Sequence, residues 1–223
     1  MKKYSDFSRI AFIVIAMVVS LSFVSCGGDD DDDEKIGGVG KGNIQWLDKS
    51  MNFSYAVCML DNDSDSDFKY YTYALSDKPF RSYSIGGYDV VMASEGSSTI
   101  AIRVLAPLMA DNKFPTGEIP SDSHTSEPHQ AYWIDMDIDL NYNLFNLADE
   151  TGLKPEYSYG FYNNDRPQLF ITDLGGGKYK ISLSGTSRYN LEHDGQNTQG
   201  TATYNVLYEG GIKLIKMPEG LGY

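Results

Sequence analysis

Apolar and polar residues alternate with a period of two along most of the chain. In residues 131–140, one set of alternate positions holds Tyr132, Ile134, Met136, Ile138 and Leu140, and the other holds Trp133, Asp135, Asp137 and Asp139. This alternation is typical of a β-strand with one face on a core and the other in water. We therefore expect the three aspartates to lie on a solvated outer face.

The same period recurs at spacings near ten residues. Further strands are expected at 51–60, 68–75, 81–93, 99–105, 157–161, 168–173, 179–184, 200–209 and 212–216, separated by turn sequences such as Asp194-Gly195 and Gly210-Gly211. The one helical candidate is Leu144–Thr151, and the polar stretch Thr186–Gln199 is expected to form an extended hairpin loop. The pattern predicts an all-β fold: a single antiparallel β-sandwich or barrel-like domain over residues 43–223.

The first 25 residues differ from the rest. Lys2, Lys3 and Arg9 precede an apolar run from Ile10 to Val24 that is too short to span a bilayer as a helix, which needs ~20 apolar residues. A basic start, an apolar core and a small residue before a cleavage point are the marks of a signal peptide. We therefore expect residues 1–25 to be removed, leaving Cys26 as the first residue.

The residues Phe23-Val24-Ser25-Cys26 resemble a bacterial lipobox, and the acidic run from Asp29 to Glu34 resembles the export tag of surface lipoproteins in Bacteroidota. This resemblance implies that Cys26 carries acyl chains such as palmitate. It also implies that the protein is anchored in the outer membrane, facing the cell exterior. Residues 26–42 combine the acidic run with glycines and little apolar content, which predicts a disordered linker.

Charge narrows the range of partners. Without residues 1–25 the chain has 15 basic and 30 acidic side chains, a net charge of −15. Nucleic acid phosphates would be repelled by such a chain. Anionic lipid would be repelled as well, so contact with the membrane is expected through the acyl chains alone.

Cys58 is the one cysteine besides Cys26, so the folded part has no intramolecular disulfide. It lies in the apolar run from Ala56 to Leu60, with no histidine nearby in the sequence. A buried structural thiol is therefore expected rather than a nucleophile.

The acidic stretch from Asp61 to Asp67 is a candidate cation site. Asp61, Asp63, Asp65 and Asp67 place carboxylates at alternate positions, as a calcium loop does. However, Ser66 stands where such a loop has glycine, and Thr72 stands where it has a bidentate glutamate. The alternative is a solvated hairpin loop that binds no cofactor.

Aromatic residues supply a candidate ligand site. Tyr71 and Tyr73 share a strand face, and Trp133 is expected to point outward beside Asp135. Exposed rings with flanking carboxylates can stack on sugar rings and hydrogen-bond their hydroxyls. The alternative is that these tyrosines belong to the core.

No nucleophile–base pair or convincing metal-ligand set stands out in the sequence. His124 and His129 flank Pro128, which opposes the helix that a zinc site of this spacing needs. The sequence therefore favours a non-catalytic binding module on the cell surface, for a glycan or a protein. One alternative is a carbohydrate-active hydrolase using aspartates of residues 131–140, because paired carboxylates hydrolyse glycosidic bonds. Another is a structural subunit of a surface or pilus assembly.

Overall fold

The computed structural model describes residues 36–60, 68–85, 88–109, 113–119, 134–147, 150–162 and 167–216. These ranges contain strands and turns and no helix, and hence no helix long and apolar enough to cross a membrane. The strands are β1 (Gly38–Trp46), β2 (Lys49–Leu60), β3 (Phe68–Ser76), β4 (Arg81–Ile85), β5 (Tyr88–Met92), β6 (Thr99–Pro107), β7 (Gly117–Ile119), β8 (Ile134–Leu147), β9 (Glu150–Tyr162), β10 (Gln168–Gly175), β11 (Lys178–His193), β12 (Gln196–Gly211) and β13 (Lys213–Lys216).

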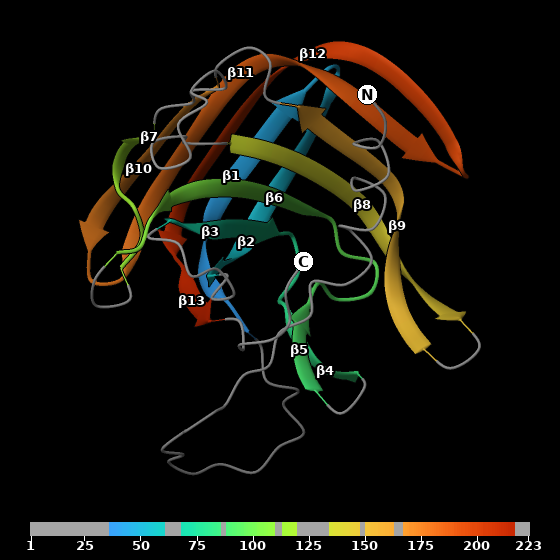
Figure 1. Ribbon diagram of the computed structural model, residues 1–223, viewed down its shortest axis with the longest axis horizontal. Coiled ribbons are helices and arrows are strands. Elements are labelled where there is room, and N and C mark those ends of the chain that lie inside the picture. Colours follow the sequence, from blue (N-terminus) through green and yellow to red (C-terminus); the bar gives the residue numbers. More distant parts are fainter. Residues whose placement is uncertain are drawn as a thin grey trace.

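Eight of these strands form a closed antiparallel barrel (Figure 1). Their order is β1-β2-β3-β6-β8-β9-β11-β12, and β12 pairs with β1 to close the ring. Each barrel strand thus neighbours the barrel strands that come before and after it along the chain. The predicted all-β antiparallel class is confirmed, and of the two architectures left open the structure has the barrel.

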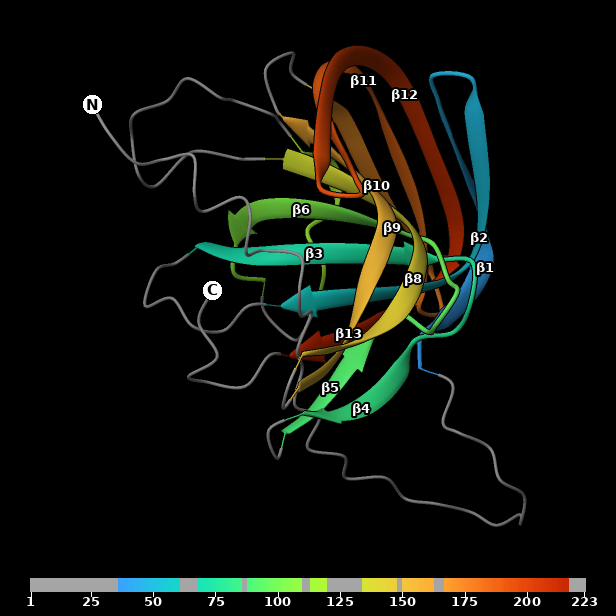
Figure 2. The same ribbon diagram turned by 90° about the vertical axis from the view of Figure 1, so that its right-hand side faces the viewer.

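The remaining strands extend this ring. β10 pairs with residues 178–184 of β11, while β9 pairs with residues 188–193 of the same strand, so β9 and β10 share one edge of β11. β7 pairs with β10, and β13 runs parallel to the end of β2. The β4–β5 hairpin lies outside the barrel (Figure 2). A small apolar cluster joins Val91 of this hairpin to Val57 and Met59 of β2.

The barrel interior is filled with side chains, as expected for eight strands. The inward positions carry many aromatic residues, and Cys58 lies fully buried among them, as predicted. The aromatic members of this core are Trp46, Phe53, Tyr71, Tyr73, Phe114, Tyr159, Phe161, Tyr204 and Tyr208.

Glycines make room for several of the interior tyrosines. Gly185 is paired directly with Tyr204, and a Cβ at Gly185 would lie 2.7 Å from the Tyr204 hydroxyl. Gly200 is paired with Tyr189 in the same way, with 2.7 Å to its hydroxyl. A ring that folds over a glycine covers the exposed backbone and lets the strand bend, which a barrel requires.

Two sequence predictions about local structure are wrong. Residues 144–147 lie in strand β8, not in a helix. Residues 186–193 and 196–199 are strand, and only Asp194 and Gly195 form the turn, both with positive φ (50° and 72°) as a tight hairpin turn requires. The sequence of residues 186–199 suggested a loop because the outward-facing positions are polar. Its inward-facing positions nevertheless pack on the core.

The predicted linker also ends earlier than expected. Ile36 is buried and bridges to Phe80, and Gly38 to Gly42 belong to β1. The glycines of this stretch are required by close packing against β12: a Cβ at Gly38 would lie 2.2 Å from the backbone of Gly211. Residues 26–35 of the predicted linker, including the whole of its acidic run, lie outside the described residues.

Candidate functional site

The predicted aromatic site does not form as expected. Tyr71 and Tyr73 are fully buried and face the barrel interior, so they cannot form an exposed stacking surface. The alternation of residues along β3 correctly predicted that the two tyrosines lie on the same face of the strand. Closure of the sheet into a barrel turns that face toward the interior. Trp133 lies outside the described residues, as do Cys26 and the candidate cation ligands Asp61, Asp63, Asp65 and Asp67. For Asp135 the structure gives only the strand position, opposite Arg103 of β6.

The predicted solvated face of β8 is also wrong for Asp137 and Asp139, which are 9% and 2% exposed. Asp139 points away from the interior, and residues 96–98, which lead directly into β6, lie alongside β8 at this point. They are held there by backbone hydrogen bonds from Tyr142 N to Ser97 O (2.9 Å) and from Gly96 N to Tyr142 O (2.7 Å). Burial of Asp139 comes from the side chains that surround its carboxylate, among them Tyr142 and Ser158, which strand periodicity cannot indicate.

A buried hydrogen-bond network surrounds Asp139. The Tyr142 hydroxyl donates to Oδ2 of Asp139 (2.8 Å) and lies 3.3 Å from the Thr99 hydroxyl, and the Ser158 hydroxyl also hydrogen-bonds Asp139. Oδ1 of Asp139 is buried without a partner. Burial is the main cause that raises the pKa of Asp139 to about 6, and the hydrogen bonds from Ser158 and Tyr142 oppose this shift.

A raised carboxyl pKa is a common mark of a catalytic acid. A general acid must also come within about 3 Å of the proton that it transfers. Asp139 and Asp137 are buried in this structure, so a hydrolase mechanism through them would need the groups around them to move away. Within the described ranges, no three His, Cys, Asp or Glu side chains gather to hold a metal ion.

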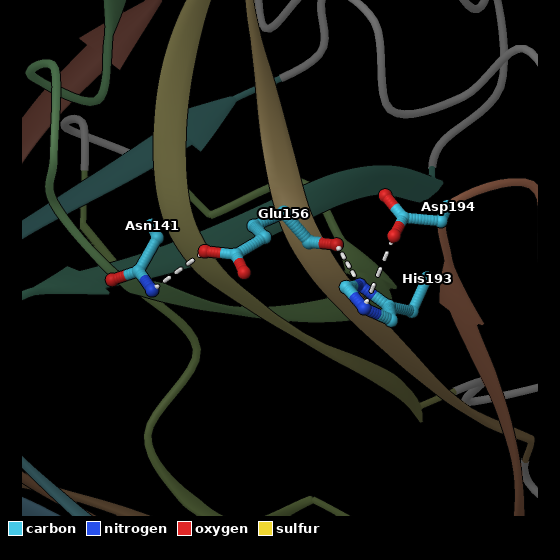
Figure 3. Close-up of polar contacts among 4 residues, drawn as sticks. All are labelled: Asn141, Glu156, His193 and Asp194. Carbon is cyan, nitrogen blue, oxygen red and sulfur yellow. Dashed lines mark hydrogen bonds and ion pairs between the residues drawn. The ribbon is translucent and has the colours of Figure 1, made fainter.

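A second polar cluster lies on the surface where β8, β9 and β11 meet (Figure 3). The Asn141 amide donates to Glu156 (3.1 Å), and Nδ1 of His193 lies 3.1 Å from the Glu156 carbonyl oxygen. Nε2 of His193 lies 3.4 Å from Asp194, and the imidazole stacks on Tyr157 with the ring centroids 4.0 Å apart. His193, which belongs to the stretch expected to form a loop, instead ties the end of β11 to β9.

The outer surface of the barrel carries an extended uncharged area, here called the polar face. Strand register places its residues in two parallel rows across β10, β11, β12, β1 and β2. The first row is Gln168, Ser184, Asn205, Gln45 and Ser50, and the second is Phe170, Ser182, Leu207, Asn43 and Asn52.

Neighbouring strands lie ~4.8 Å apart, so each five-strand row extends about 19 Å, and the two rows are about 6.7 Å apart. None of the ten side chains carries a charge. Charged residues begin in the adjacent row, with Lys180, Glu209 and Lys41, and Glu118 of β7 lies directly beside Phe170.

The polar face presents unused hydrogen-bonding groups. Among the described residues, none of its eight amide or hydroxyl side chains makes a hydrogen bond to another part of the protein, whereas the neighbouring Thr186 and Thr203 hydroxyls pair with each other at 2.8 Å. Phe170 is 42% exposed, so part of one ring face or edge is open to solvent. The face can thus offer donors, acceptors and one aromatic ring to a flat ligand.

Sequence reasoning missed the polar face because its residues come from five strands. Each strand alone shows only ordinary outward polar positions, such as Gln168 and Phe170 in β10. Knowledge of the register would have been needed to see that these positions adjoin. Comparison of the chain with protein-family models, with curated proteins and with solved structures found no match.

Proposed function

We propose that this protein is a lipid-anchored, non-catalytic binding module of the cell surface, and that the polar face binds a neutral glycan. The single observation that carries the glycan assignment is the uncharged double row of amide and hydroxyl side chains around exposed Phe170. The anchoring part of the proposal rests on the sequence around Cys26.

The chemistry of the face matches a neutral sugar chain. Amide groups both donate and accept hydrogen bonds, as sugar hydroxyls do, and hydroxyl side chains add further donors and acceptors. An aromatic ring such as Phe170 can pack on the apolar face of a pyranose. Without residues 1–25 the chain has 15 basic and 30 acidic side chains, a net charge of −15, which would repel acidic polysaccharides, so the neutral class is favoured.

Binding to immobilised polysaccharides tests this proposal. We expect the protein to bind one or more neutral glycans and to ignore uronate-rich or sulfated ones. The double variant Phe170→Ala/Asn205→Ala is expected to weaken binding at least ~10-fold, because it removes a stacking ring and a central amide worth together about 1.4 kcal/mol or more. Titration calorimetry against the positive glycan measures the change.

Thr201→Ala is the matched control, since Thr201 is an exposed residue of β12 that lies four positions before Asn205 and outside both rows. The control should bind as the wild type does. Equal losses in the double variant and the control, or no binding to any neutral glycan, would remove the polar face as the site.

The anchor has its own test. Cells that produce the wild-type protein are expected to incorporate a clickable palmitate analogue into it, and cells that produce Cys26→Ala are expected not to. Two or more acyl chains hold a protein firmly in a membrane, at ~0.8 kcal/mol for each buried methylene. The variant should therefore also leave the membrane fraction, and equal labelling of both proteins would contradict the proposal.

A further inference from the structure

One aromatic side chain in the barrel core comes from a connecting segment. Phe114 lies between β6 and β7, outside any strand, yet is only 4% exposed. Its ring packs edge-on against Tyr179 of β11, with centroids 4.7 Å apart, and lies 6.0 Å from the ring of Tyr73 in β3. The segment therefore inserts a ring among tyrosines that the barrel strands hold in place.

Tyr73, whose ring lies beside Phe114, has a buried hydroxyl without a hydrogen-bond partner among the described residues. By contrast, the hydroxyl of Tyr71, two residues earlier on β3, has two partners. It accepts a hydrogen bond from Met109 N (3.0 Å) and donates one to the Pro107 carbonyl oxygen (3.5 Å). Cys58 is paired with Tyr73 across β2 and β3 and is fully buried as well. An unpaired buried hydroxyl costs about 1–3 kcal/mol, a cost that phenylalanine at position 73 would avoid.

The segment that carries Phe114 connects β6 to β7 and is attached to the barrel at its two ends. Among the described residues it is fixed at its start by the bond from Met109 N to Tyr71 and at its end by the three-residue pairing of β7 with β10. Residues 113–116, which carry Phe114, belong to none of the strand pairings, whereas the surrounding strands are paired along their length.

We propose that Phe114 occupies, in the resting protein, a binding site for a small neutral aromatic molecule that carries a hydroxyl or another hydrogen-bonding group. The ligand ring takes the place of the Phe114 ring against Tyr179, and its polar group pairs with the Tyr73 hydroxyl. Eight-stranded barrels are wide enough to hold one such molecule. This interior site is separate from the polar face and does not depend on the glycan proposal.

The test uses two probes of similar shape, 1-naphthol and 1-methylnaphthalene, of which only the first has a hydroxyl. The wild type is expected to bind 1-naphthol in preference to 1-methylnaphthalene. Phe114→Ala is expected to bind 1-naphthol at least ~10-fold more tightly, because the competing ring is gone. Titration calorimetry on the full folded domain gives both affinities.

Tyr73→Phe, made in the wild type and in Phe114→Ala, isolates the polar contact. It is expected to abolish the preference for 1-naphthol while leaving the melting temperature unchanged or higher, because the removed hydroxyl had no partner. Lost preference in a protein of undiminished stability cannot be attributed to unfolding. A preference that survives Tyr73→Phe would overturn the assignment.

Phe161→Ala is the matched cavity control, since Phe161 is a buried ring of β9 in the same core. Tighter binding of 1-naphthol by Phe161→Ala, to the extent seen in Phe114→Ala, would mean that any cavity serves and would refute a specific site. If Phe114→Ala does not fold, Phe114→Leu replaces it, with an expected gain of about threefold, and no gain would equally count against the proposal.

Discussion

Gly210→Ala is expected to lower the free energy of unfolding by about 3 kcal/mol, the upper part of the range for overpacked interiors. A Cβ at position 210 would lie 2.3 Å from Cα of Gly40 and 2.7 Å from the carbonyl oxygen of Val39. Both contacts are with backbone, so relief requires β1 and β12 to separate. In a domain of this size the change corresponds to a melting temperature about 6–12 °C lower, measurable by calorimetry.

The adjacent glycine provides the control. A Cβ at Gly211 would meet nothing nearer than Cα of Gly38 at 3.3 Å, so a shift of a few tenths of an ångström accommodates it. Gly211→Ala is therefore expected to cost less than a third as much as Gly210→Ala. If the two variants lost equal stability, the close contact between β1 and β12 would not be the cause.

Asp139→Asn is expected to change how stability depends on pH. Burial raises the folded-state pKa of Asp139 to about 6, from an ordinary value of 3.8. Between these values the folded protein binds more protons than the unfolded chain, so the contribution of Asp139 to stability falls as the pH rises through this window. The full loss is about 3 kcal/mol above pH 6, at 1.36 kcal/mol for each pKa unit.

The amide oxygen of an asparagine side chain can still accept the hydrogen bond from the Tyr142 hydroxyl, but the side chain cannot ionise. The difference in unfolding free energy, variant minus wild type, should therefore increase by about 2.4 kcal/mol between pH 4 and pH 7, since a small part of the loss has already occurred at pH 4. Urea denaturation at a series of pH values gives this difference directly. Parallel curves for the two proteins would show that Asp139 keeps an ordinary pKa in the folded state.

Strand positions were largely predictable from the sequence, because a half-buried strand must alternate. The expected strands at 51–60, 99–105 and 168–173 match β2, β6 and β10 to within about two residues at each end. Alternation also assigned Met136 and Ile138 to one face and Asp137 and Asp139 to the other. The barrel itself was not predictable, since the pairing that closes it joins β1 to β12 from opposite ends of the domain.

The candidate sites depended on information that a single strand does not contain. The sequence cannot show which face of β3 becomes the interior, so Tyr71 and Tyr73 were expected on a surface. It cannot show that Tyr142 and Ser158 surround the Asp139 carboxylate either. The polar face needed the register of five strands, and the position of Phe114 beside Tyr73 needed the path of a connecting segment.

The order of barrel strands has a consequence for synthesis of the chain. Every barrel strand finds a partner among its neighbours in sequence except for the contact between β1 and β12. Because β12 is synthesised nearly last, the free edge of β1 has no partner while most of the chain is being made. Bringing two such distant segments together carries the largest loop-closure entropy in the fold, so ring closure should be the slow step of folding.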